Sequence, residues 1–165
     1  MSANAEQVIL DKISDRASLQ ANIKRWQAGG QKVVFTNGVF DLLHIGHITY
    51  MAKAAALGNK LVIGLNSDAS VKRIKGAGRP VNDQNSRAFL LAALLFVDAV
   101  VLFEEDTPQQ LITSLLPDVL VKGADYSIEN IAGAKEVLAN GGEVKTIEFV
   151  DGYSSTRIIE RIKGS

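Results

Sequence analysis

Short apolar runs alternate with amphipathic stretches along most of the chain. Runs of β-branched and other apolar residues between polar turns predict buried strands, whereas apolar residues at helical spacing predict helices. On this basis we expect strands at residues 32–35, 61–65, 99–103, 119–121 and 144–149. Helices are expected at residues 14–27, 47–57, 84–95, 108–115, 130–139 and 155–163.

This alternation predicts an α/β fold. Five strands separated by helices imply right-handed crossovers and a doubly wound, Rossmann-like, five-stranded parallel sheet. We expect one compact domain overall, with a helical extension at residues 1–31 before a catalytic or binding domain at residues 32–165. Ligands of such sheets bind beyond the carboxyl ends of the strands. Polar segments follow several of the predicted strands, at residues 36–37, 66–68, 123–125 and 152–157.

The two histidines of the chain lie three residues apart, just after the first of these polar turns. The segment His44-Ile45-Gly46-His47 spans a predicted strand-to-helix junction. Imidazoles at this spacing lie about one turn apart on one side of the helix, beside backbone N–H groups that have no acceptor inside it. Such a corner binds anions, and Gly46 leaves the backbone open to a phosphate. We expect neutral rings that donate hydrogen bonds, although two histidines here also suit a helix cap.

A second helix start carries a cluster of hydroxyl groups near the C-terminus. Gly152 precedes Ser154, Ser155 and Thr156 at the beginning of the last predicted helix. Serine and threonine at such positions cap helices. A capped N-terminus with further hydroxyl donors is also a phosphate cradle, so both uses are compatible.

A basic, glycine-rich stretch lies at residues 72–80 and contains four positive charges. We interpret it as a mobile loop that covers bound phosphates, with Lys75 and Arg79 as the first candidates for phosphate contacts and Lys72 as the next. An ordinary solvated loop is the alternative.

Composition narrows the possible functions. The 18 basic and 18 acidic residues balance, so no global field draws the protein to nucleic acid or to an anionic membrane. The absence of cysteine excludes disulfides and cysteine metal sites, and the N-terminus lacks the pattern of a signal peptide, so we expect a cytoplasmic protein. The chain also lacks the G-x-G-x-x-G turn of dinucleotide-binding dehydrogenases and the G-x-x-x-x-G-K-[ST] loop of P-loop NTPases.

From Lys32 to Ile162 the chain resembles the HxGH nucleotidyltransferases. Within that superfamily it is most similar to the adenylyltransferases that make ADP-heptose, in residues 35–44, 66–70, 103–108, 121–126 and 131–137. The resemblance implies transfer of AMP from ATP to D-glycero-β-D-manno-heptose 1-phosphate, with release of pyrophosphate, for lipopolysaccharide core or a related glycan. Transfer to another acceptor, such as glycerol 3-phosphate or a coenzyme precursor, and a nucleotide sensor without catalysis stay open.

Pattern and resemblance together assign the site. We expect His44, His47 and Lys75 to be catalytic. The expected substrate-binding residues are Thr36, Asn37, Gly38, Phe40, Gly46, Lys72, Arg79, Arg87, Gly123, Asp125, Tyr153, Ser154, Ser155 and Thr156. A surface ion pair would explain Arg87 equally well. We expect Mg²⁺ to bind mainly through the ATP phosphates rather than through protein ligands, and the resemblance implies a homodimer.

Overall fold

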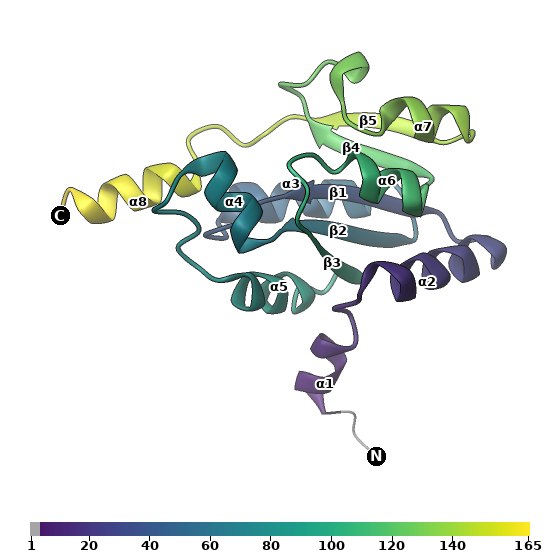
Figure 1. Cartoon of the computed structure of the whole chain (residues 1–165), viewed down its shortest axis with the longest axis horizontal. Helices are drawn as coiled ribbons and strands as arrows, with labels where there is room; N and C mark the ends of the chain where they lie inside the picture. Colours follow the sequence, from purple (N-terminus) through teal and green to yellow (C-terminus); the bar gives the residue numbers. More distant parts are fainter. Residues whose placement is uncertain (1–3) are drawn as a thin grey trace.

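The computed structural model of the chain describes residues 4–165 and contains one sheet of five parallel strands (Figure 1). The strands are β1 (Val33–Gly38), β2 (Lys60–Asn66), β3 (Ala99–Phe103), β4 (Val119–Gly123) and β5 (Glu143–Ile147). Their order across the sheet is β3-β2-β1-β4-β5. The connections therefore reverse direction between β1 and β4, which is the switch point where doubly wound sheets bind ligands. The predicted fold class is confirmed.

Helices cover both faces of this sheet. The regular helices are α1 (Ala5–Leu10), α2 (Arg16–Ala28), α3 (Ile45–Ala55), α4 (Asp68–Lys75), α5 (Gln84–Ala92), α6 (Gln109–Leu115), α7 (Ala134–Ala139) and α8 (Ser155–Lys163), and a short 3₁₀ helix, η1, spans Ile128–Asn130. Helices α2, α6 and α7 pack on one face, whereas α3 and α5 pack on the other (Figure 1).

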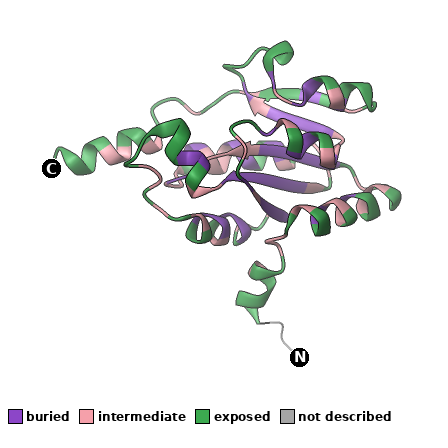
Figure 2. Ribbon diagram, viewed as in Figure 1, coloured by how far each residue is buried: buried purple, intermediate pink, exposed green. Residues whose placement is uncertain are grey.

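The side chains of β1 alternate between two apolar cores. Phe35 points to the core that contains Leu19 of α2 and Leu111 of α6, whereas Val34 points to the core that contains Met51 of α3. All five side chains are fully buried, and β1, β2 and β3 form the most continuously buried part of the molecule in Figure 2, whereas β5 at the edge is mostly exposed. Each such side chain contributes about 1.5–3 kcal/mol by leaving water, so the strand ends are held firmly.

Helix α4 corrects the expectation of a basic loop at residues 72–80. Ser67 caps this helix by accepting a hydrogen bond from the N–H of Ser70, and buried Val71 attaches the helix to the body. Lys72 and Lys75 therefore lie in the last helical turn. Gly76, at a φ of 101°, ends the helix, so only residues 76–80 form the loop.

The helix expected at residues 130–139 is also shorter than predicted. Gly133 adopts a φ of 81°, which lies in the left-handed region and separates η1 from α7. The division of the chain at residue 31 stays a prediction, although α2 packs Leu19 and Ile23 directly into the core of the sheet.

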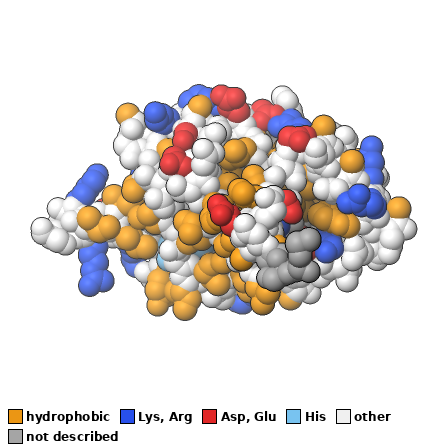
Figure 3. Space-filling model, turned by 90° about the horizontal axis from the view of Figure 1, so that it is seen from below, with side chains coloured by type: hydrophobic (Ala, Val, Ile, Leu, Met, Phe, Trp, Pro, Cys, Tyr) orange, Lys and Arg blue, Asp and Glu red, His pale blue; other side chains and the backbone are white. Residues whose placement is uncertain are grey.

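Helices α1 and α8 have no buried residue. Helix α8 projects from the body near the carboxyl ends of the strands, and Lys and Arg side chains extend from it in the space-filling view (Figures 1 and 3). No helix within residues 4–165 is sufficiently long and apolar to cross a membrane.

Candidate active site at the switch point of the sheet

A cavity of about 670 Å³ lies at the carboxyl ends of β1 and β4. A volume in this range accommodates a small-molecule ligand and falls within that of ordinary ligand pockets. Most of the predicted site residues line it: Asn37, Gly38, Phe40, His44, Gly46, His47, Lys75, Arg79, Gly123, Asp125, Tyr153, Ser154, Ser155 and Thr156. Thr36, Lys72 and Arg87 do not line it.

The two histidines form a stacked pair at the start of α3. His44 is the N-cap residue, and its extended backbone brings its ring over that of His47, with the ring centroids 3.8 Å apart. The side chain of His44 makes no capping hydrogen bond. The Nδ1 atoms of both rings are buried and have no hydrogen-bond partner within the described residues. The helix cap considered from the sequence therefore does not explain these side chains.

Burial keeps both rings in the neutral form. Burial, reinforced by the adjacent His44 ring, lowers the pKa of His47 to about 4, although a hydrogen bond to the backbone of Leu42 acts in the opposite direction. Burial also lowers the pKa of His44. Each neutral imidazole carries one N–H, so the pair presents hydrogen-bond donors without a positive charge at neutral pH.

The backbone around this pair is held in a tight conformation. A Cβ atom at Gly46 would lie 3.0 Å from the His44 ring and 3.3 Å from Cβ of Tyr153, so a larger residue would press against both. Phe40 adopts a φ of 45°, which is strained for a residue with a side chain. Its buried ring packs edge-on against His47 with a centroid distance of 5.3 Å.

The hydroxyl cluster at the start of α8 is partly engaged by the protein. Ser154 accepts a hydrogen bond of 3.0 Å from the N–H of Arg157, and Ser155 donates one of 2.8 Å to the carbonyl of Leu42. The second contact ties α8 to the loop that precedes α3. Thr156 forms no side-chain hydrogen bond among the described residues, and its hydroxyl is exposed at the cavity. Both helix starts thus face the same cavity.

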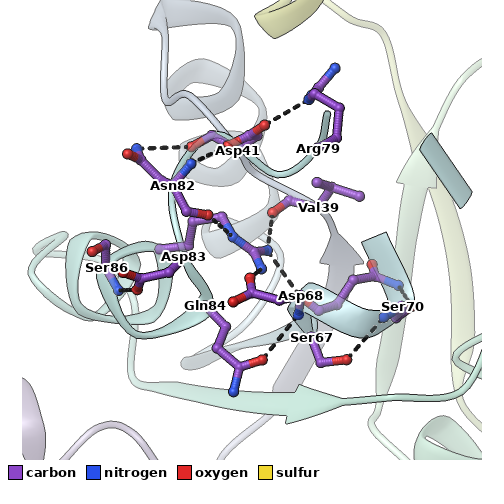
Figure 4. Close-up of polar contacts among 12 residues, drawn as sticks. Val39, Asp41, Ser67, Asp68, Ser70, Arg79, Asn82, Asp83, Gln84 and Ser86 are labelled. Atoms are coloured by element: carbon purple, nitrogen blue, oxygen red, sulfur yellow. Dashed lines mark hydrogen bonds and ion pairs between the residues drawn. The ribbon is translucent and has the colours of Figure 1, made fainter. Parts of the chain in front are cut away.

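Asp41 anchors the loop that carries Arg79. Its fully buried carboxylate accepts hydrogen bonds from Nε of Arg79 at 2.7 Å and from the backbone N–H groups of Val81 and Asn82 at 2.9 Å (Figure 4). Burial by itself would raise the pKa of Asp41, but the hydrogen bonds from Asn82, Val81 and Arg79 outweigh it and lower the pKa. This carboxylate is therefore an ionised structural group.

Arg87 lies beneath the same loop and is 1% exposed. Its guanidinium donates hydrogen bonds to the carbonyl oxygens of Val39, Asn66 and Asn82 and to the carboxylate of Asp68, at 2.8–2.9 Å (Figure 4). The surface ion pair considered from the sequence is therefore only part of the arrangement: Arg87 does pair with the partly exposed Asp68, but its guanidinium is buried and binds three backbone carbonyls as well. We call Asp41, Asp68, Arg79, Asn82 and Arg87 the anchor network.

Thr36 contributes to the floor beneath the cavity. Its buried hydroxyl donates to the carbonyl of Val121 on β4 at 3.0 Å and is paired with the hydroxyl of Tyr50 on α3 at 2.9 Å. The ring of Tyr50 in turn stacks on Phe149. Burial raises the pKa of Tyr50 to about 12, so this hydroxyl remains protonated.

One basic residue that lines the cavity is absent from the residues predicted from the sequence. Lys122, near the end of β4, lines the cavity, and burial lowers its pKa to about 8 despite the nearby Asp125. A lysine just before the Gly123 turn of a buried strand is the sequence signal for it. The sequence alone does not show that this lysine reaches the site, because its position depends on which strand lies beside β4.

Comparison with known proteins agrees with the geometry. The model of the cytidylyltransferase-like family matches residues 35–161. The "bifunctional protein HldE" of Vibrio cholerae is 57% identical over 152 residues, which are 92% of this chain and 32% of that protein. The protein of the same name from Cronobacter sakazakii is 54% identical over 151 residues, with the same coverage. The chain therefore spans about a third of the length of the curated relatives that it matches.

Two solved structures share the fold. The "lipopolysaccharide core biosynthesis protein" of Thermoplasma volcanium has a TM-score of 0.59 and 31% identity, covering 76% of this chain and all of the other. The pantoate-beta-alanine ligase of Francisella tularensis has a TM-score of 0.55 at 14% identity, covering 92% of this chain and 76% of that one. The second likeness concerns the fold alone.

Proposed function

Because this chain belongs to the cytidylyltransferase-like family of nucleotidyltransferases, we propose that it transfers AMP from ATP to D-glycero-β-D-manno-heptose 1-phosphate. The products are ADP-heptose and pyrophosphate. One observation carries the proposal: His44 and His47 stack at the open start of α3, with buried nitrogen atoms that no group of the described protein satisfies. Buried polar atoms are normally paired, so their partners belong to a ligand.

The choice of acceptor rests on similarity rather than on geometry. Residues 35–44, 66–70 and 121–126 are among the segments most similar to ADP-heptose-forming adenylyltransferases. The 31% identical structure from Thermoplasma volcanium is described as a protein of lipopolysaccharide core biosynthesis, which agrees with a product for that core or a related glycan. The family model alone is equally compatible with glycerol 3-phosphate or a coenzyme precursor as acceptor.

The proposed reaction needs little covalent chemistry from the protein. An oxygen of the sugar phosphate attacks the α-phosphorus of ATP, the bond between the α-phosphorus and the bridging oxygen breaks, and pyrophosphate leaves with that electron pair. The nucleophile is already an anion at neutral pH, so no general base is required. The barrier lies in bringing two anions together and in stabilising charge on the phosphoryl oxygens.

The protein groups are arranged for this task. The neutral rings of His44 and His47 and the free N–H groups at the start of α3 donate to the α-phosphoryl oxygens as charge develops there. Lys75 at the end of α4 and Arg79 on the adjacent loop supply positive charge from the other side of the cavity. Thr156 and the first turn of α8 are positioned to bind the remaining phosphates.

We further propose that Mg²⁺ enters with ATP. Within residues 4–165 no three His, Asp or Glu side chains are grouped to hold a metal ion, and the anchor network engages both oxygens of Asp41. The ion would therefore be held by phosphate oxygens and water, where it neutralises charge on the leaving pyrophosphate. We also propose that the protein is a cytoplasmic homodimer that has no nucleic-acid partner.

The first test is pyrophosphate release by the purified protein with Mg²⁺ and the heptose 1-phosphate. ATP should support release, and CTP should not. Release with ATP and glycerol 3-phosphate, but not with the heptose phosphate, would contradict the proposed acceptor and keep the chemistry. ATP binding without release with any of these acceptors would instead favour a nucleotide sensor.

A further inference from the structure

The cavity extends across both faces of the sheet at its carboxyl edge. Along β1, Phe35 packs in the core covered by α2, α6 and α7, so Asn37, two residues further along, points to that same face. Leu120 of β4 packs in that core too, which places Lys122 on the same face. The histidines belong to α3, which covers the opposite face.

The register of the two strands brings Asn37 and Lys122 together. Val34 pairs with Val119 and Phe35 with Leu120, and continuing this register by two residues places Asn37 beside Lys122. The ladder itself ends at Phe35 and Leu120, and Asn37 and Lys122 lie two residues beyond it, on the same face of the two adjacent strands. Both line the cavity at the switch point.

The polar atoms of these two side chains have no partner in the described protein. Oδ1 of Asn37 is buried and accepts no hydrogen bond. Nζ of Lys122 forms no hydrogen bond or ion pair within residues 4–165 and lies 5.4 Å from the centre of the Tyr126 ring. The aromatic face fixes the position of the ammonium without neutralising it. A ligand that satisfies both atoms carries an anionic group for Lys122 and an O–H or N–H donor for Asn37, and a sugar phosphate provides both.

We propose that Lys122 and Asn37 form the subsite for the acceptor, with the Lys122 ammonium binding the phosphate of a sugar phosphate and Asn37 Oδ1 accepting from a sugar hydroxyl. The inference rests on the proposed function, because it divides one cavity between two substrates. ATP occupies the side of α3 and α8, where the histidines and hydroxyl groups lie. The acceptor occupies the side of β4, from which its phosphate approaches the α-phosphorus across the edge of the sheet.

Both substrates of the proposed reaction are anions, and this subsite provides a positive charge for the second of them. A phosphate dianion is repelled by the triphosphate that it must attack, so a separate cation on the acceptor side is needed to bring the two together. Lys122 is the cavity-lining cation that comes from the sheet itself, whereas Lys75 and Arg79 come from α4 and the loop after it. A side chain on a strand is held more precisely than one on a loop such as that of Arg79.

The test measures equilibrium binding of each substrate without turnover. Isothermal titration calorimetry of the full chain with Mg²⁺ and α,β-methylene-ATP gives the nucleotide affinity, and a second titration of that complex with the heptose 1-phosphate gives the acceptor affinity. Lys122→Met should weaken acceptor binding about 10- to 100-fold, the range for a charged hydrogen bond, and change nucleotide affinity less than about threefold. Lys122→Arg should recover most of the acceptor affinity.

Lys53→Met is the matched control, because Lys53 is an exposed lysine of α3 that does not line the cavity. It should change neither affinity, and the melting temperature of Lys122→Met should stay close to that of the wild type. Unchanged acceptor binding in Lys122→Met would overturn the inference. A loss of nucleotide affinity as large as the loss of acceptor affinity would overturn it as well, because Lys122 would then serve the triphosphate.

Failure of the proposed function has a different signature. If the wild type binds the heptose phosphate through Lys122 but releases no pyrophosphate, the subsite stands and the proposed activity fails. If the wild type binds glycerol 3-phosphate instead, the proposed acceptor fails, and the same variants titrated with glycerol 3-phosphate decide whether Lys122 holds its phosphate.

Discussion

Asp41 of the anchor network lies in the same segment as the histidine pair, residues 41–47, yet buried polar atoms are paired in the network and unpaired in the two histidines. Asp41 and Arg87 are 1% exposed, and the protein supplies hydrogen-bond partners to both. The Nδ1 atoms of His44 and His47 are also buried, but the described protein offers them none. A buried charge with a full set of partners positions the chain, whereas a buried donor or acceptor without one indicates where a ligand binds.

The largest effect on stability should come from Arg87. Arg87→Met removes a buried guanidinium that donates to three carbonyl oxygens and to Asp68, and it leaves those carbonyl acceptors, the buried one of Asn66 included, without their donor. Because an unpaired buried acceptor costs about 1–3 kcal/mol, we expect a total loss of about 3–5 kcal/mol in the free energy of unfolding, measured by urea denaturation. Arg73→Met is the control, because its ion pair with Asp106 is exposed and contributes about 1 kcal/mol or less. Equal losses in the two variants would contradict the conclusion that the buried, fully paired charge of Arg87 stabilises the fold more than an exposed ion pair does.

Substitution in the histidine pair should affect activity strongly and stability only slightly. His47→Ala should lower the rate of pyrophosphate release by on the order of 10²- to 10³-fold, because it removes a donor that acts on charge developing in the transition state. The free energy of unfolding should change by about 1 kcal/mol. Rates and denaturation curves measured on the same preparation check both statements. A His47→Ala variant that unfolds easily but turns over normally would assign the ring to structure.

Asp41 connects the anchor network to the candidate site, because it anchors the loop that presents Arg79 to the cavity. Asp41→Asn keeps the shape of the side chain but weakens its charged hydrogen bonds, and we expect a loss of about 1.5–3 kcal/mol of stability at pH 7. Because the pKa of Asp41 is lowered on folding, this contribution is fully present above its unfolded value near 4 and is lost at lower pH. The stabilities of wild type and variant should therefore converge in acid.

The smallest effect should be a pH dependence of acceptor binding. The pKa of Lys122 is lowered to about 8 by burial, so its ammonium is largely lost between pH 7 and 9, and the acceptor dissociation constant should rise about five- to tenfold. The hydroxyl of Tyr50 stays neutral in this range, because burial raises its pKa to about 12. Calorimetry across the range is the measurement, and Lys122→Arg, whose guanidinium stays charged, should show no such rise.

Local patterns in the sequence predict the elements whose signals lie within a single segment. The bounds of β3 and α8 agree with the prediction, because an apolar run or a hydroxyl-capped amphipathic stretch defines each. Helix α4 was missed because Gly76 and Gly78 in the same stretch favoured a loop over the short apolar spacing of Val71 and Ile74. That error placed Lys72 and Lys75 in a loop rather than in the last turn of a helix.

The candidate site was predictable to the extent that it follows from motifs. His44, His47 and the hydroxyl groups of residues 154–156 lie at helix starts that can be recognised locally, and the structure brings them to one cavity. Lys122 could not be recognised in this way, because its place beside Asn37 depends on the strand order and register. The partners of Arg87 are mostly backbone carbonyls, and the direction of a carbonyl cannot be predicted from the pattern of side chains in the sequence.

Gly123 closes a ring of contacts that restricts how the floor of the cavity can evolve. A Cβ atom there would lie 2.2 Å from the Phe149 ring, which stacks on Tyr50, whose hydroxyl meets Thr36, which in turn bonds Val121 of the same strand. A residue larger than glycine at position 123 would therefore have to displace the Phe149 ring from its stack on Tyr50. Among homologous sequences a side chain at position 123 should therefore occur only together with a change at position 149, so that substitutions at these two positions are coupled.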